Sequence, residues 1–175
     1  SVFFQKSYLC LESEDRLHLS IKNEQVHFIL HSVCTIFAQK RDMGRKEEYK
    51  LQNEQFLETL RTEKGIKELP CGILYRVLEK GKGEATPRYN SVVSVHYKGS
   101  LINGREFDNS WKRKHPEAFR LNQVIKGWQI ALQQMHIGDH WLIYIPFAIG
   151  YGTRSNGPIP AFSTLIFEVK LLGIA

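Results

Sequence analysis

The sequence lacks the short motifs that identify many classes of enzyme. It has no GxSxG nucleophile motif, no phosphate-binding P-loop and no glycine-rich dinucleotide fingerprint. Its three cysteines are widely spaced without a CxxC pair, and its seven histidines show no metal-ligand spacing such as HExxH. We therefore expect reduced, mostly structural thiols, no metal site, no cofactor and no covalent catalytic dyad.

Long apolar runs are also absent. No run reaches the roughly 18 residues that a membrane-spanning helix needs, so no membrane span is predicted. The most apolar stretch, residues 26–38, contains two histidines and lacks the short cationic segment that precedes the hydrophobic region of a signal peptide. This pattern favours a strand or helix segment over an export signal.

Charge of one sign is not concentrated in any part of the chain. The net charge is +6, which mildly favours anionic partners. Without a dense block of Lys and Arg this charge is a weak indication of nucleic-acid binding, and none is predicted. The 175 residues suffice for one globular domain of about 100–150 residues with an extension.

What the sequence does contain divides into three segments. Residues 1–40 form an N-terminal extension of unknown role, with short apolar groups and no motif that we can interpret. Residues 41–68 are rich in polar helix formers and predict a connecting helix, which Gly65 would end. Residues 69–175 form the predicted domain. The thin apolar stripe of the connecting helix is expected to consist of Leu51, Phe56, Leu57 and Leu60.

The predicted domain contains five or six antiparallel strands and one helix. Residues 91–101 alternate apolar and polar side chains, which predicts a half-buried strand. Asn103-Gly104 then supplies a tight hairpin turn, because both residues tolerate positive φ. Residues 124–135 carry apolar side chains at helical spacing and form the predicted helix. Further strands are expected at residues 73–78, 105–109, 118–121, 140–145 and 164–172, with a Gly/Pro-rich loop at 146–161.

Five motifs follow one another along this domain: VHYKG at 95–99, FDNS at 107–110, VIKGW at 124–128, IGYG at 149–152 and TLIFEVKLL at 164–172. Together they closely resemble the FKBP-type (immunophilin) peptidyl-prolyl isomerases over about residues 71–174. The polar helix before them resembles the linker of the bacterial, Mip-like branch. The resemblance implies an α+β fold, in which a curved antiparallel β-sheet, or half-barrel, wraps on one α-helix after an N-terminal helical extension.

By matching position, the resemblance implies an aromatic-lined pocket between helix and sheet. Trp128 would form its floor, while the Tyr151 hydroxyl and the Ile125 backbone N–H would donate hydrogen bonds to substrate carbonyls. Asp108 would pair with Arg113 or hold a wall of the pocket in place. The implied catalytic residues are Tyr97, Phe107, Asp108, Trp128, Tyr151 and Phe167, and the implied substrate-binding residues are Val124, Ile125, Phe119, Ile159 and Arg113.

The activity implied by the resemblance is rotation of X–Pro bonds in proline-containing polypeptides, which assists protein folding. Amide resonance sets its barrier at about 18–20 kcal/mol. A dry apolar pocket penalises the planar, charge-separated amide more than the twisted transition state. Because this chemistry needs no metal, cofactor or acid–base pair, the absence of such motifs agrees with it.

Three departures from the family pattern affect the rim of the pocket more than its floor. Ala161 follows Pro160 where the family has a second proline, and Glu117 stands where many members carry an aromatic residue. Residues 111–115, WKRKH, are more basic than usual and most simply form a solvated loop, although their charge could select substrates with acidic residues near the proline. We expect activity to survive, whereas binding of macrolide inhibitors stays open.

Other interpretations also stay open. Most aromatic residues are expected to build the core, Asp108 has the alternative role of an Asx-turn residue, and Tyr151 that of a loop anchor. The same fold could serve as a non-catalytic chaperone or proline-peptide binding module, and the basic loop could bind nucleic acid. The expected compartment is the bacterial cytoplasm, or the periplasm or cell envelope if residues 26–38 act as an export signal. The oligomeric state and the physiological substrate are not determined by the sequence.

Overall fold

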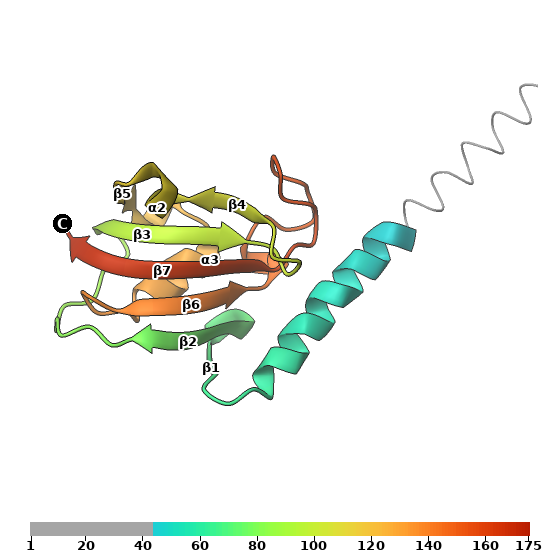
Figure 1. The fold of residues 1–175 in the computed structure, drawn as a ribbon, viewed down its shortest axis with the longest axis horizontal. Helices are drawn as coiled ribbons and strands as arrows, with labels where there is room; N and C mark the ends of the chain where they lie inside the picture. Colours follow the sequence, from blue (N-terminus) through green and yellow to red (C-terminus); the bar gives the residue numbers. More distant parts are fainter. Residues whose placement is uncertain (1–43) are drawn as a thin grey trace, which may run out of the picture. The chain divides into compact units, whose positions relative to one another are not determined.

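The computed structural model describes residues 44–175, whose helices and strands are shown in Figure 1. The predicted extension at residues 1–40, with its apolar segment at 26–38, lies outside the described residues. In the described part of the chain, no helix combines the length and apolar character that crossing a bilayer requires. Cys71 is free and exposed there.

One antiparallel sheet dominates the described residues (Figure 1), in the strand order β1-β2-β6-β7-β3-β4. A further strand, β5, pairs with the first half of β3, whereas β4 pairs with its end. This open sheet with few helices confirms the predicted fold class, and the three-residue β1 is an unpredicted addition. The strands are β1 (Lys67–Leu69), β2 (Ile73–Glu79), β3 (Val92–Ser100), β4 (Glu106–Asn109), β5 (Glu117–Arg120), β6 (His140–Ile145) and β7 (Leu165–Ile174).

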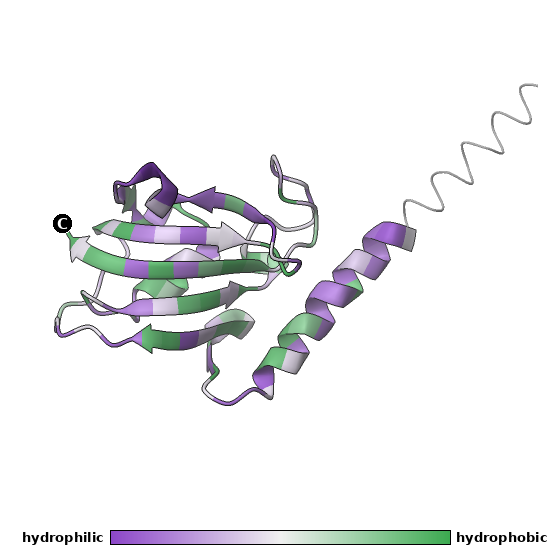
Figure 2. Cartoon of the chain, in the orientation of Figure 1, coloured by the Kyte–Doolittle hydropathy of each residue, from purple (hydrophilic) through white to green (hydrophobic). Residues whose placement is uncertain are grey.

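The inner face of the sheet packs on one helix. Along β3 buried and partly exposed residues alternate strictly, as the sequence predicted, so that Val93, Val95 and Tyr97 face inward. The predicted helix is shorter than expected at both ends: α3 spans Lys126–Leu132. Ile125, with ψ of 148°, has a non-helical backbone and caps its start, and residues 133–134 form a turn after it. Figure 2 shows the hydrophobic residues along β6 and β7 that belong to these packed layers. Short 3-10 turns precede β2, α3 and β7, namely η1 (Pro70–Gly72), η2 (Leu121–Gln123) and η3 (Phe147–Ile149).

The outer face of the sheet packs on the predicted connecting helix, which occupies residues 44–61 in the described chain. Leu57 and Leu60 bury their side chains against Leu74 of β2 and Tyr144 of β6. Leu51 was predicted on the same stripe, but it is 52% exposed. It precedes Leu57 and Leu60 by six and nine residues, and these spacings place it on a different face of the helix. Both faces of the central strands are therefore covered by a helix.

Two local predictions were right in place and wrong in detail. Gly104 has a positive φ of 80°, but Asn103 does not, and its side-chain oxygen instead accepts a hydrogen bond from the Arg105 N–H at 3.0 Å. The turn is thus built on an Asx interaction rather than on two left-handed residues. The basic segment after β4 is not a plain solvated loop, because it begins with a helical turn, α2 (Ser110–Arg113).

The close approach of α3 to β6 depends on Gly127. A Cβ added there would lie 2.8 Å from Cδ1 of Ile145, which is fully buried. We predict that Gly127→Ala lowers the free energy of unfolding by about 1–3 kcal/mol, as overpacking of a core does. Urea denaturation measures this, with Gly173→Ala as the matched control because nothing lies within 4 Å of the added carbon. Equal unfolding free energies for the two variants would contradict the prediction.

Candidate active site

Three aromatic rings surround the indole of Trp128 in α3. Tyr97 of β3, Phe119 of β5 and Phe167 of β7 lie with ring centroids 5.3, 5.6 and 5.2 Å from that of the indole. Their planes are inclined to the indole plane by 88°, 90° and 79°, the edge-to-face arrangement that aromatic pairs favour. Phe107 of β4 extends the group through a perpendicular contact with Phe167 at 5.6 Å. We call these five residues the aromatic cluster.

The register of the sheet explains why these rings meet. Gly99 lies opposite Phe167 on β7 and opposite Asp108 on β4, next to Phe107. A Cβ at position 99 would overlap the Phe107 ring and lie 3.0 Å from Cε1 of Phe167. The missing side chain therefore leaves the space in which the two phenyl rings pack.

Exposure changes from the base of the aromatic cluster to its edge. Trp128, Tyr97 and Phe167 are buried, whereas Phe107 and Phe119 are only half-buried. The indole Nε1 of Trp128 is buried and has no hydrogen-bond partner among the described residues. The cluster thus presents an apolar base with a partly accessible edge. Val124 and Ile125 are half-buried beside it, and Ile159 is part of the same buried core.

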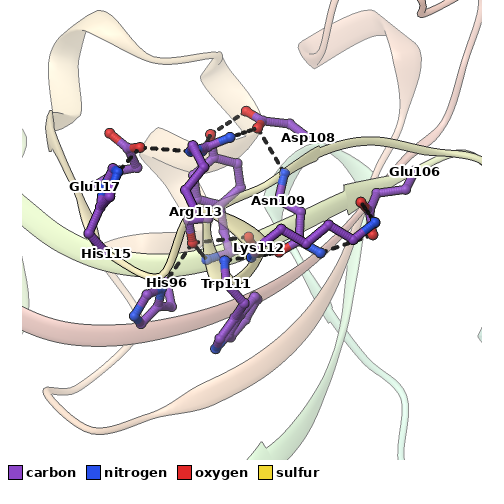
Figure 3. Close-up of polar contacts among 11 residues, drawn as sticks. His96, Glu106, Asp108, Asn109, Trp111, Lys112, Arg113, His115 and Glu117 are labelled. Carbon is purple, nitrogen blue, oxygen red and sulfur yellow. Dashed lines mark hydrogen bonds and ion pairs between the residues drawn. The ribbon is translucent and has the colours of Figure 1, made fainter.

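A polar network around Asp108 and Arg113 (Figure 3) is joined to the aromatic cluster through Tyr97. The Tyr97 hydroxyl donates a short hydrogen bond to Oδ2 of Asp108. The Arg113 guanidinium donates to Oδ1 of Asp108 at 2.5 Å and to the Tyr97 hydroxyl oxygen at 3.2 Å. The Asn109 backbone N–H adds a third donor to Asp108 at 2.8 Å. Asp108 therefore does pair with Arg113, one of the two arrangements considered from the sequence.

This network sets the protonation states of its members. Burial raises the pKa of Tyr97 to about 12, with a further contribution from the hydrogen bond to Asp108. Burial alone would raise the pKa of Asp108, but hydrogen bonds from Tyr97 and Arg113 outweigh it and lower that pKa below its usual range. The same contacts raise the pKa of Arg113. Near neutral pH, Asp108 is ionised and Tyr97 is neutral, with its one proton committed to Asp108.

The turn α2 places Arg113 in this network. The Asn109 side chain caps the turn by accepting hydrogen bonds from the backbone N–H groups of Trp111 and Lys112. The Trp111 ring stacks on His96 with centroids 5.4 Å apart, and Oε1 of Glu117 accepts from Nε of Arg113 at 3.0 Å. Sequence reasoning treated Glu117 only as a replaced aromatic and missed this bond, because its partner depends on how the turn folds.

Tyr151 stands apart from the aromatic cluster. It follows η3 in the loop before β7, its side chain is 38% exposed, and it is not among the residues packed on the core. Among the described residues, its hydroxyl has no hydrogen-bond partner, and the Ile125 backbone N–H has no acceptor. Both groups are therefore available to an external acceptor. In the same part of the chain, no three His, Cys, Asp or Glu side chains gather closely enough to hold a metal ion.

The comparisons with known proteins agree with this geometry. The family model described as FKBP-type peptidyl-prolyl cis-trans isomerase matches residues 83–172. The chain belongs to this family. The matched range contains all five motifs in full, the strands β3 to β6 and most of β7. The resemblance to this family predicted from the motifs is thereby confirmed.

Relatives of this FKBP chain include proteins that extend beyond the matched range. An FKBP-type peptidyl-prolyl cis-trans isomerase, FkpA, of Buchnera aphidicola subsp. Schizaphis graminum is 37% identical over 90% of this chain and 64% of its own length. The outer membrane protein MIP of Legionella longbeachae is 39% identical over 89% of this chain and 68% of its own. The crystal structure of FkpA from Escherichia coli has a TM-score of 0.74, at 36% identity, over 90% of this chain and 74% of that one.

The FKBP chain spans only part of the proteins that it matches. It covers 64%, 51% and 45% of the length of the first three curated relatives. The similarity places the chain in the Mip and FkpA branch, as the polar helix before the domain suggested from the sequence.

The ion pair at the edge of the FKBP site gives a testable pH dependence. We predict that Arg113→Gln raises the pKa of Asp108, measured from the carboxyl carbon by NMR, because a donor and a positive charge are lost. The neighbouring Lys112→Gln is the control, because Lys112 pairs with Glu106 instead, and it should leave this pKa unchanged.

The sign of the stability effect follows from the lowered pKa of Asp108. Its contribution is present above the unfolded carboxyl pKa of about 3.9 and is lost as pH falls through the lower folded value. Arg113→Gln should therefore lose less stability on acidification than the wild-type chain does. An equal loss in both would show that Arg113 does not hold the charge of Asp108.

Proposed function

We propose that this chain catalyses cis–trans isomerisation of X–Pro bonds in polypeptides, with the proline ring bound over Trp128. The observation that carries the proposal is the enclosure of the indole by three perpendicular rings from three strands. Such a site offers an apolar base with aromatic walls, which suits a compact, apolar ring such as that of proline. The family to which the chain belongs supports the same reaction.

The proposed mechanism is non-covalent. A planar amide is charge-separated and is solvated well by water, whereas the twisted transition state has lost much of that resonance. An apolar site made of Trp128, Phe107 and Phe167 therefore favours the twisted state relative to the planar one. Phe119, Val124 and Ile159 complete the apolar surroundings of the bound segment in this proposal.

Hydrogen bonds to the substrate fall to groups that are not already paired. The Tyr151 hydroxyl and the Ile125 backbone N–H have no partners among the described residues, so each can donate to a substrate carbonyl. The Tyr97 hydroxyl cannot do so without breaking its bond to Asp108. We therefore assign Tyr97, Asp108 and Arg113 to one wall of the site, where they hold the ring of Tyr97 in place.

Proline-containing polypeptides are the proposed substrates, and protein folding is the proposed role. Acidic residues near the proline are not part of this proposal. Lys112 is paired with Glu106, and Arg113 is paired with Asp108 and Glu117, so their charge is largely neutralised within the protein. Macrolide inhibitors are a further class of ligand for the same apolar site.

A protease-coupled assay on an X–Pro peptide tests the proposal. Trp128→Leu should lose most of kcat/KM, because the base of the site is removed. Tyr151→Phe should lower kcat/KM about two- to tenfold, the effect of one net hydrogen bond. Tyr89→Phe is the matched control, because Tyr89 is also exposed, at 53%, and is not among the site residues. A loss equal to that of Tyr151→Phe in this control would contradict the role of Tyr151.

The same assay separates the competing interpretations. If the wild-type chain binds the peptide but does not accelerate its isomerisation, the chain is a non-catalytic binding module and not an isomerase. Nucleic-acid binding through the basic turn would instead appear as an affinity that falls steeply with salt concentration. A flat salt titration removes that third function.

A further inference from the structure

Asn53 is a fully buried polar residue on the packed face of the helix at residues 44–61. Its exposed fraction is 0%, whereas Asn residues are mostly exposed in proteins. It shares this face with Leu57 and Leu60, at spacings of four and seven residues. A buried amide on an apolar face requires hydrogen-bond partners, and one of them lies 111 residues further along the chain.

The side chain of Asn53 binds the last residue of the loop before β7. Its Oδ1 accepts a hydrogen bond from the Thr164 backbone N–H at 2.7 Å, and Thr164 is itself fully buried. The Thr164 hydroxyl donates in turn to the Asn53 backbone carbonyl at 3.4 Å. The amide Nδ2 donates to the Tyr49 carbonyl at 2.7 Å, so both polar atoms of the side chain are used.

A second contact joins the same helix to the same loop. The Tyr49 hydroxyl lies 3.0 Å from Oγ of Ser163, and this Oγ donates to the Pro160 carbonyl at 2.8 Å. Because Ser163 has one hydroxyl proton and uses it there, Tyr49 is the donor in its own contact. The relay ends on the residue directly after Ile159, which belongs to the buried core of the site.

The loop also ties this anchored end to Tyr151. Phe162 has a left-handed backbone with φ of 63°, which is costly for a residue with a side chain and persists only where the surroundings hold it. Its N–H donates to the Gly152 carbonyl at 3.0 Å, and its ring contacts Phe147 at 5.4 Å. Gly152, which follows Tyr151, is therefore hydrogen-bonded to Phe162, which precedes Ser163.

We infer that Asn53, assisted by Tyr49, is a positioning residue for the isomerase site. It anchors the loop of residues 150–164 to the helix, and through Phe162 and Gly152 it fixes the place of Tyr151. This inference rests on the proposed function, in which Tyr151 donates to the substrate. The helix then acts as a support for the site in addition to connecting the domain to what precedes it.

The test compares Asn53→Ala and Tyr49→Phe with Gln52→Ala, an exposed neighbour on the same helix. We expect kcat/KM to fall about two- to tenfold in Asn53→Ala and by less in Tyr49→Phe, with no change in Gln52→Ala. The backbone amide signal of Gly152 should shift in an ¹⁵N NMR spectrum of the first two variants and not in the third. Circular dichroism at the assay temperature shows that each variant is folded.

A double-mutant cycle with Tyr151→Phe distinguishes positioning from a general loss of stability. If Asn53 acts through Tyr151, its substitution should cost much less once the Tyr151 hydroxyl is absent. Additive losses together with an unshifted Gly152 signal would overturn the inference. If Asn53→Ala does not fold, Tyr49→Phe takes its place in the double-mutant cycle and in the NMR comparison, and the same outcomes support or overturn the inference. If the wild-type chain shows no isomerase activity, the proposed function is overturned, and the inference that Asn53 positions the isomerase site is overturned with it.

Discussion

Burial of the Trp128 indole among rings from three strands is the constraint on which the rest of this structure depends. The indole can reach that position only because Gly127 lets α3 approach Ile145 of β6. Phe167, one of these rings, can pack against Phe107 only because Gly99 leaves space beside β4 and β7. The same contacts that close the core of the domain therefore also form the base of the proposed site, so that packing and function share one set of side chains.

The polar side of the site shows how a charge is kept next to an apolar base. Asp108 would be costly there without partners, and it receives donors from Tyr97, Arg113 and its own chain neighbour. The result is a wall rather than an acid–base pair, because Asp108 is held ionised and the Tyr97 hydroxyl proton is already committed to it. In the proposed mechanism, Tyr151 and the Ile125 N–H, both on segments outside the sheet, donate the hydrogen bonds to the substrate. Such a division suits a reaction that needs desolvation and orientation but no proton transfer.

Much of the fold followed from local patterns in the sequence. The alternation along β3 and the helical spacing around Trp128 predicted which side chains face the core, and the structure agrees. Details that depend on a single side-chain bond did not follow. The cap formed by Asn109, which makes α2 a helical turn, and the Asx interaction of Asn103 compete with other local conformations that the same residues allow. Only the packing around them selects one.

The sequence by itself determined the family, the periodicity of the strands and the kinds of residue at the site, because all of these depend on spacing along the chain. The tertiary structure decided which of those residues are free to act. It paired Tyr97 with Asp108 and left Tyr151 unpaired among the described residues. It also placed Asn53, a polar residue within the predicted connecting helix, in a buried contact with Thr164. Hydrogen bonds between segments so far apart leave no periodic trace in the sequence, so only the folded chain reveals them.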